Sequence, residues 1–290
     1  MPASHQNGTC SSGTLEIAYR RFGAGDGLPL LIVHGLSYFS YDWIDIAGEL
    51  ATGREVVAMD MRGFGDSQRS AEGDYGVPAM AGDIVAVLDH LGWKRAVLMG
   101  HSMGGRNAAL ATARNPERVA GLVLVDYSPE NAPAGAQRVA KTIAGAPDVF
   151  ASVEAAMRYF GIDPAAPAAQ AKRSRYEAYL RRVEGGYEIK RAPHFAQQFR
   201  RLLETGERPK LGVDMWQVLG EIACPILALR GRQSDMFAAE TAPKLSAANS
   251  RLELVEVDGG HNIPGDNPAG LVSVVRPFLA TLESRHEQAA

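Results

Sequence analysis

Short runs of consecutive hydrophobic residues recur along the chain and predict strands. The clearest runs end on a polar residue or a glycine and occupy 30–33, 56–59, 97–99, 122–125 and 226–229. Alternating hydrophobic and polar residues at 14–20 and 252–257 predict further strands. Uninterrupted hydrophobic runs are typical of strands buried on both faces, as in a parallel sheet that helices cover.

Helical patterns lie between these strands. Hydrophobic residues recur at helical spacing in 42–50, 80–91 and 241–248, and a further helix is expected between Ser102 and Pro116, because proline ends a helix. Alternating strands and amphipathic helices predict an α/β fold with a doubly wound, mostly parallel sheet.

One long segment breaks this alternation. Residues 128–212 contain no buried strand, only helix-like stretches such as 153–160 and 175–183. An insertion that follows a sheet strand predicts a helical cap over the carboxyl end of the sheet. We therefore expect residues 1–127 and 213–290 to form the α/β core and 128–212 the cap. A separate interaction domain is the alternative.

Composition limits the partners. A chain of 290 residues with 46% hydrophobic residues can bury a large core, and a net charge of -3 creates no field that would attract nucleic acid or an anionic membrane. A small-molecule substrate fits better. Cys10 and Cys224 are expected to be free thiols, and no signal peptide or membrane span is evident, so we expect a cytoplasmic protein. The pattern does not determine the oligomeric state.

The candidate nucleophile is Ser102, in the sequence Gly100-His101-Ser102-Met103-Gly104 between a predicted strand and a predicted helix. A turn tight enough to raise a serine from the end of a strand leaves room only for glycine two residues before and after it. Its hydroxyl needs a base to remove the proton during attack. The helix that follows directs N–H groups toward developing negative charge.

The candidate base is His261, in a glycine-rich loop directly after the last predicted strand. The other histidines lie near the chain ends, on a helix, in the insertion, or beside the turn and the early loop. An oxyanion hole needs two backbone donors. We expect them to be the N–H groups of Met103, after the nucleophile, and of Leu36, in the loop after the 30–33 strand.

Two acids can orient the histidine. Asp126 ends the 122–125 strand, and Asp235 follows the 226–229 strand, so both are expected at the catalytic edge of the sheet. Residue types and positions leave the choice open. The other acid is then expected to cap a loop, a common role for aspartate.

Other residues near the predicted site have two interpretations. His34, Trp43 and His101 are candidates for the substrate pocket, although core packing explains Trp43 equally well and the two histidines suit structural roles. The basic residues of the insertion favour a solvated face, with a contact to a substrate carboxylate as the alternative; they are Lys172, Arg173, Arg175, Arg181 and Arg182. No metal-binding or dinucleotide motif is present, so no metal or cofactor is expected.

Over essentially its whole length the chain resembles the α/β-hydrolase superfamily. The motifs that carry the resemblance occur in the expected order and spacing; they are His34-Gly35, Asp60-x-Arg62-Gly63-Phe64-Gly65-x-Ser67, Gly100-x-Ser102-x-Gly104-Gly105 and Gly259-Gly260-His261. The resemblance implies a nucleophile, acid, histidine order and a helical cap. A serine nucleophile argues against the dehalogenase and epoxide hydrolase branches, which use aspartate there.

The resemblance also bears on the acid. In many members the acid lies three residues after the glycine that ends the next-to-last strand, and that position here is Ser234, one residue before Asp235. In an esterase-like branch the acid instead follows the preceding strand in an Asp-x-[Ser/Thr/Gly]-Pro setting. Asp126-Tyr127-Ser128-Pro129 looks like this setting. We therefore favour Asp126, with Asp235 as the alternative.

The resulting prediction is a serine hydrolase that cleaves a carboxylic ester of a small organic molecule through an acyl-enzyme. Amide, thioester or carbon-carbon hydrolysis by the same Ser-His-Asp triad is the nearest alternative. From a different class, the same fold also serves as a non-catalytic small-molecule receptor or a cofactor-free oxygenase.

Overall fold

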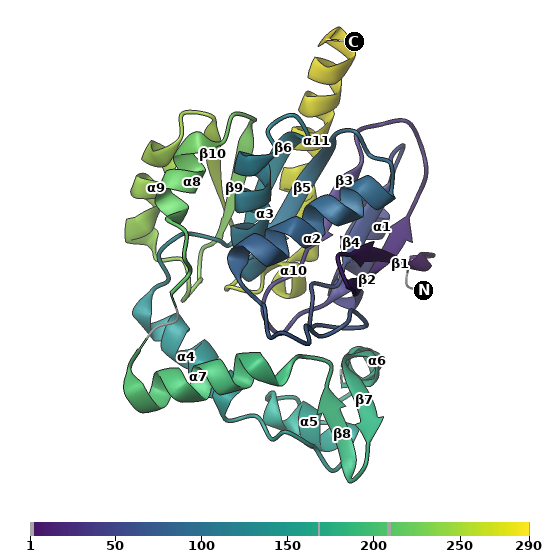
Figure 1. The fold of residues 1–290 in the computed structure, drawn as a ribbon, viewed down its shortest axis with the longest axis vertical. Coiled ribbons are helices and arrows are strands. Elements are labelled where there is room, and N and C mark those ends of the chain that lie inside the picture. Colours follow the sequence, from purple (N-terminus) through teal and green to yellow (C-terminus); the bar gives the residue numbers. More distant parts are fainter. Residues whose placement is uncertain (1–2, 168, 208–209, 290) are drawn as a thin grey trace.

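An eight-stranded sheet forms the centre of the protein in the computed structural model, which describes residues 3–167, 169–207 and 210–289 (Figure 1). In spatial order the strands are β1 (Gln6–Ser12), β2 (Leu15–Phe22), β4 (Val56–Met59), β3 (Leu30–Val33), β5 (Ala96–His101), β6 (Val119–Val125), β9 (Ile226–Gly231) and β10 (Leu252–Val257). The β1–β2 and β2–β4 pairs are antiparallel, and the pairs from β4 to β10 are parallel. The predicted mostly parallel sheet is confirmed.

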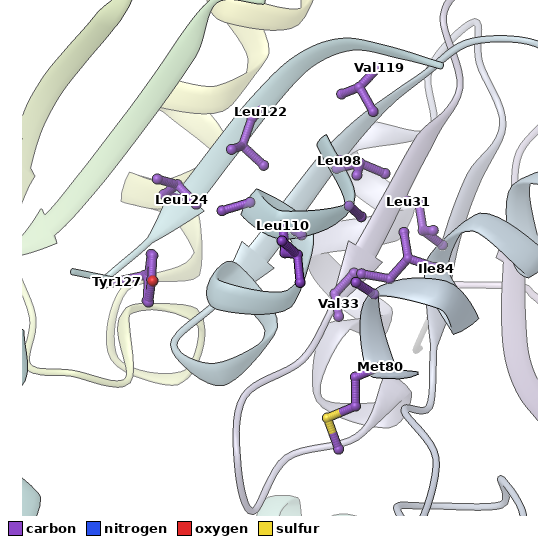
Figure 2. Close-up of a cluster of buried hydrophobic side chains, with 14 of the residues drawn as sticks. Leu31, Val33, Met80, Ile84, Leu98, Leu110, Val119, Leu122, Leu124 and Tyr127 are labelled. Atoms are coloured by element: carbon purple, nitrogen blue, oxygen red, sulfur yellow. The ribbon is translucent and has the colours of Figure 1, made fainter. Parts of the chain in front are cut away.

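Helices cover both faces of this sheet. On one face are α2 (Val77–His90), α3 (Met103–Arg114) and α8 (Met215–Glu221); on the other are α1 (Ile44–Leu50), after a 3-10 turn at Ser40–Trp43, and α11 (Pro268–Ala289). The short helices α9 (Ala242–Ala248) and α10 (Ile263–Asp266) pack on β10 and α11. Side chains of β3 alternate between the faces: Leu31 and Val33 meet Ile84 of α2 (Figure 2), whereas Leu30 and Ile32 join the opposite cluster.

The chain between β6 and α8 forms a separate layer beside the carboxyl edge of the sheet (Figure 1). It contains α4 (Pro133–Ala144), α5 (Val153–Tyr159), α6 (Ala169–Tyr179), β7 (Leu180–Val183), β8 (Gly186–Ile189) and α7 (Pro193–Thr205). We call this layer the cap. It has an apolar cluster of its own, centred on Phe150, Met157 and Tyr179. The prediction of a continuous helix over 175–183 is wrong, because α6 ends at Tyr179 and β7 begins an antiparallel hairpin.

The cysteines and the helices bear on two further expectations. Cys10 and Cys224 are free, as the sequence predicts, and both are buried. In the described part of the chain, no helix combines the length and the apolar character that crossing a membrane requires.

Candidate active site

Ser102 occupies a sharp turn between β5 and α3. Its backbone has φ 52° and ψ -117°, a strained conformation for a residue with a side chain. The neighbouring glycines make the turn possible: a Cβ on Gly100 would lie 2.5 Å from the carbonyl oxygen of Gly104, and a Cβ on Gly104 would lie 2.2 Å from that of Val33. The close packing of the turn therefore requires glycine at both of these positions.

The imidazole of His261 lies between Ser102 and Asp126. Its Nε2 is 3.0 Å from Ser102 Oγ, and its Nδ1 is 2.7 Å from Asp126 Oδ2. Since a carboxylate only accepts hydrogen bonds, Nδ1 carries the proton and Nε2 is left to accept from the serine hydroxyl. This is the geometry of a nucleophile, a base and an acid that orients the base.

Asp126 is buried, 2% exposed, directly after β6. Its φ of 45° turns the residue out of the strand direction. Its Oδ1 accepts from the N–H of Gly231 at 2.7 Å, and its Oδ2 accepts from Ser234 Oγ at 2.5 Å in addition to His261. These donors compensate for the desolvation of a buried carboxylate. The last residue of β9 and the loop after it thus contribute one donor each to the carboxylate that follows β6.

The alternative acid, Asp235, has a different environment. Its carboxylate accepts hydrogen bonds from Nε and Nη2 of Arg138, on α4 of the cap, at 2.5 and 2.8 Å. The Asp235 side chain is 37% exposed. The hydrogen bond from Arg138 lowers the pKa of Asp235. Its carbonyl also accepts from the N–H of Gly135 at 3.1 Å. Asp235 therefore docks the cap, and the structure contradicts its assignment as the acid that contacts His261.

The two expected oxyanion donors lie at neighbouring strand ends. Met103 is the first residue of α3, where a backbone N–H has no acceptor within the helix, and Leu36 follows β3 in a partly exposed loop. Within the residues that the structure describes, neither N–H donates to another group. Both are thus available to a negatively charged oxygen. The next residue, Ser37, has a φ of 70°.

The three residues predicted for the substrate pocket, His34, Trp43 and His101, are all buried. His34 accepts from the N–H of Met61 through Nε2 at 2.9 Å and donates to the carbonyl of Gly35 through Nδ1 at 2.8 Å, and burial lowers its pKa to about 4. Trp43 is 1% exposed in the apolar cluster beneath the sheet. His34 is thus hydrogen-bonded to the backbone on both sides of its ring, and Trp43 packs in the core.

His101 contacts the backbone of the loop that carries His261. Its Nε2 donates to the carbonyl of His261 at 2.8 Å, and burial, followed by the nearby His261, lowers the pKa of His101 to about 3. A neutral His101 therefore holds the backbone of His261 in place. No local sequence pattern indicates this contact, because it joins residues 160 positions apart in the chain.

A comparison with protein families identifies the family of this chain. Residues 29–268 match the model of the alpha/beta hydrolase fold. The chain belongs to this family. It is a hydrolase of the alpha/beta fold, and the matched segment includes all the residues described above.

Proteins similar to this hydrolase are named for different substrates. It is 28% identical over 267 residues to a 2-hydroxymuconate semialdehyde hydrolase of Pseudomonas sp., covering 90% of each chain. It is 29% identical over 261 residues to a 3-hydroxybutyrate-oligomer hydrolase of Cupriavidus necator, covering 86% of this chain and 88% of the relative. A crystal structure of E-2-(acetamidomethylene)succinate hydrolase superposes with a TM-score of 0.82 at 25% identity, covering 96% of this chain and 100% of the other.

Proposed function

We propose that this hydrolase cleaves a carboxylic ester of a small organic molecule through a covalent acyl-enzyme on Ser102. The observation that carries the proposal is the hydrogen-bonded chain from Ser102 Oγ through His261 to Asp126, with distances of 3.0 and 2.7 Å. A hydroxyl is a weak nucleophile until a base takes its proton, and a neutral imidazole in contact with it is the base that acyl transfer needs.

The reaction follows from this arrangement. Ser102 Oγ attacks the ester carbonyl while His261 Nε2 takes the hydroxyl proton, and Asp126 stabilises the imidazolium that forms. The N–H groups of Leu36 and Met103 donate to the oxyanion of the tetrahedral intermediate. When the intermediate collapses, His261 returns the proton to the alcohol that leaves. Water then attacks the acyl-enzyme by the same route, and the carboxylic acid is released.

The choice of an ester rests on chemistry and on one relative. An alcohol is a better leaving group than an amine, and the 3-hydroxybutyrate-oligomer hydrolase supports ester cleavage in this part of the family. The semialdehyde hydrolase keeps a second candidate open, hydrolysis of a carbon-carbon bond next to a ketone by the same triad. Both reactions need the same nucleophile and base, so the substrate panel has to distinguish them.

Two measurements test the proposal. A fluorophosphonate probe is expected to label the wild-type protein and not the Ser102→Ala variant; labelling that does not depend on Ser102 would reject the nucleophile. Turnover of p-nitrophenyl esters, an aryl amide, a thioester and a vinylogous diketone is then compared at equal concentrations. We expect the esters to be fastest, and dominance of the diketone would overturn ester cleavage in favour of carbon-carbon hydrolysis.

A further inference from the structure

A cap arginine holds the loop that carries one expected oxyanion donor. Residues 34–39, which we call the oxyanion loop, follow β3 in the core, and Arg175 lies on α6 of the cap. Arg175 Nη2 donates to the carbonyl of Ser37 at 3.2 Å. Its Nε and Nη2 also donate to the two carboxylate oxygens of Asp42, at 2.5 and 3.1 Å. One guanidinium therefore contacts the loop and an acid beside it.

Asp42 extends this contact to the far side of the loop. Its Oδ2 accepts from the N–H of Phe39 at 3.1 Å, so Arg175 and Asp42 together hold the peptide groups on both sides of Tyr38. Burial lowers the pKa of Arg175, but the charge and the hydrogen bonds of Asp42 raise it more, and its net shift is upward. The pair is thus a charged clamp in a mostly dry environment, where ionic hydrogen bonds are strong.

The rest of the loop is also held from the cap. Arg191, between β8 and α7, donates through Nη1 to Ser37 Oγ at 3.2 Å, and the ring of Phe39 is fully buried in the cap's apolar cluster, 5.3 Å from that of Tyr179. The positive φ of Ser37 costs a residue with a side chain about 1 kcal/mol or more and persists only where neighbours impose it. Cap side chains supply these neighbours.

We propose that the cap completes the oxyanion hole, with Arg175 as the positioning residue that fixes the Leu36 N–H through Ser37 and Asp42. This inference rests on the proposed function, because it assumes an oxyanion in the reaction. It also replaces the interpretation of the basic cluster as one solvated face. Lys172 and Arg182 are exposed, whereas Arg175 lies between the cap and the core.

Arg173 offers a matched control on the same helix. Its guanidinium pairs with Glu154 of α5 and with Glu177 of α6, both inside the cap, and its side chain is 35% exposed against 24% for Arg175. Arg173→Met therefore removes an ionic contact of the cap without touching the oxyanion loop. Arg175→Met makes the same chemical change, arginine to methionine, at the clamp.

The test compares kcat, KM and the affinity of an aryl trifluoromethyl ketone, whose adduct with Ser102 carries an oxyanion. For Arg175→Met we expect kcat to fall about 10- to 100-fold, less than the 10²- to 10³-fold typical of removing an oxyanion donor outright. The ketone affinity should fall in parallel while KM changes less than about threefold. Arg173→Met should leave all three unchanged. A change in KM alone, or equal effects of the two variants, would overturn the proposal.

A readout without substrate keeps the inference separate from the proposed function. Amide hydrogen exchange at 36–39 should be faster in Arg175→Met than in Arg173→Met, and Arg175→Lys, which cannot bind Asp42 and Ser37 together, should give the same direction if the methionine variant does not fold. A wild-type protein without ester turnover or Ser102 labelling would reject the proposed function. Normal turnover and unchanged exchange in Arg175→Met would reject the clamp alone.

Discussion

Asp126 and Asp235 follow neighbouring strands of one sheet, yet they face different parts of the protein. Asp126 is buried and accepts from Gly231, Ser234 and His261, whereas Asp235 is partly exposed and binds Arg138 of the cap. Both loops reach the same edge, so proximity to the site does not distinguish them. The difference lies in their partners. Hydrogen-bond donors stabilise the Asp126 carboxylate where it contacts the His261 imidazole, whereas the Asp235 carboxylate forms an ion pair with Arg138 of the cap.

The loop after β9 contacts the carboxylate that orients the histidine but does not supply that carboxylate. Ser234 lies at the position where many family members carry the carboxylate, and its hydroxyl now donates to Asp126 at 2.5 Å. The hydroxyl also accepts from the N–H groups of Met236 and Phe237 at 3.2 and 3.0 Å, which directs its own proton toward Asp126. The loop after β9 therefore supports the carboxylate that follows β6.

Removing the charge of Asp126 should have the largest effect on turnover of any change at these two aspartates. In Asp126→Asn we expect kcat for the best ester to fall about 10⁴-fold, because an amide can favour the wrong tautomer of His261 and cannot stabilise the imidazolium. Steady-state kinetics near neutral pH measures the loss. A variant that keeps more than about a tenth of the wild-type rate would show that Asp126 is not the acid.

Moving the acid from position 126 to the loop after β9 should sharpen the comparison between the two loops. Asp126→Ala combined with Ser234→Asp places a carboxylate on the other loop, while alanine vacates the space that Asp126 occupies. Since Ser234 Oγ is already within 2.5 Å of the oxygen that meets His261, we expect the double variant to recover about 10-fold or more of the rate lost in Asp126→Ala. Rates no higher than those of the single variant would show that the β9 loop cannot present an acid to His261.

The hydroxyl of Ser234 should matter less than either carboxylate change. Ser234→Ala removes one donor to a buried carboxylate, a bond worth about 1.5 kcal/mol, so we expect kcat to fall about 10-fold. Ser128→Ala is the matched control, because Ser128 Oγ donates to the carbonyl of Glu130 at 2.8 Å instead. Equal effects of the two variants would assign Ser234 to the turn alone.

Sequence pattern predicted the buried strands because each is an uninterrupted hydrophobic run, and β3, β4, β5, β6 and β9 all have this form. It missed β1 and the cap hairpin. The sequence of β1, Gln-Asn-Gly-Thr-Cys-Ser-Ser, is polar because the strand lies at the sheet edge, and β7 continues directly from α6 with charged residues at Arg181 and Arg182. Edge strands take their stability from pairing, which leaves little hydrophobic signal.

The candidate site divides in a similar way. Ser102 and His261 could be found because the turn and the glycine-rich loop have local steric requirements, and the structure brings their side chains together. The choice between Asp126 and Asp235 depended on a family motif, since both positions follow strands. Arg175 could not be separated from its basic neighbours, because its partners Asp42 and Ser37 lie far away in the chain.

The smallest effect is expected at Asp235. Asp235→Asn should leave kcat within about twofold, because the carboxylate does not contact His261, and solvent screening of this partly exposed pair limits its stabilisation to about 0.5 kcal/mol. Arg138 lowers the pKa of Asp235 from 3.8, so the folded state binds this proton less readily than the unfolded state. The stabilisation is therefore present above about pH 4 and is lost as the pH falls through the folded-state pKa. Thermal melts of both proteins should differ by a constant small amount from pH 8 to pH 5, and a loss of turnover comparable to that of Asp126→Asn would place both aspartates in the catalytic machinery.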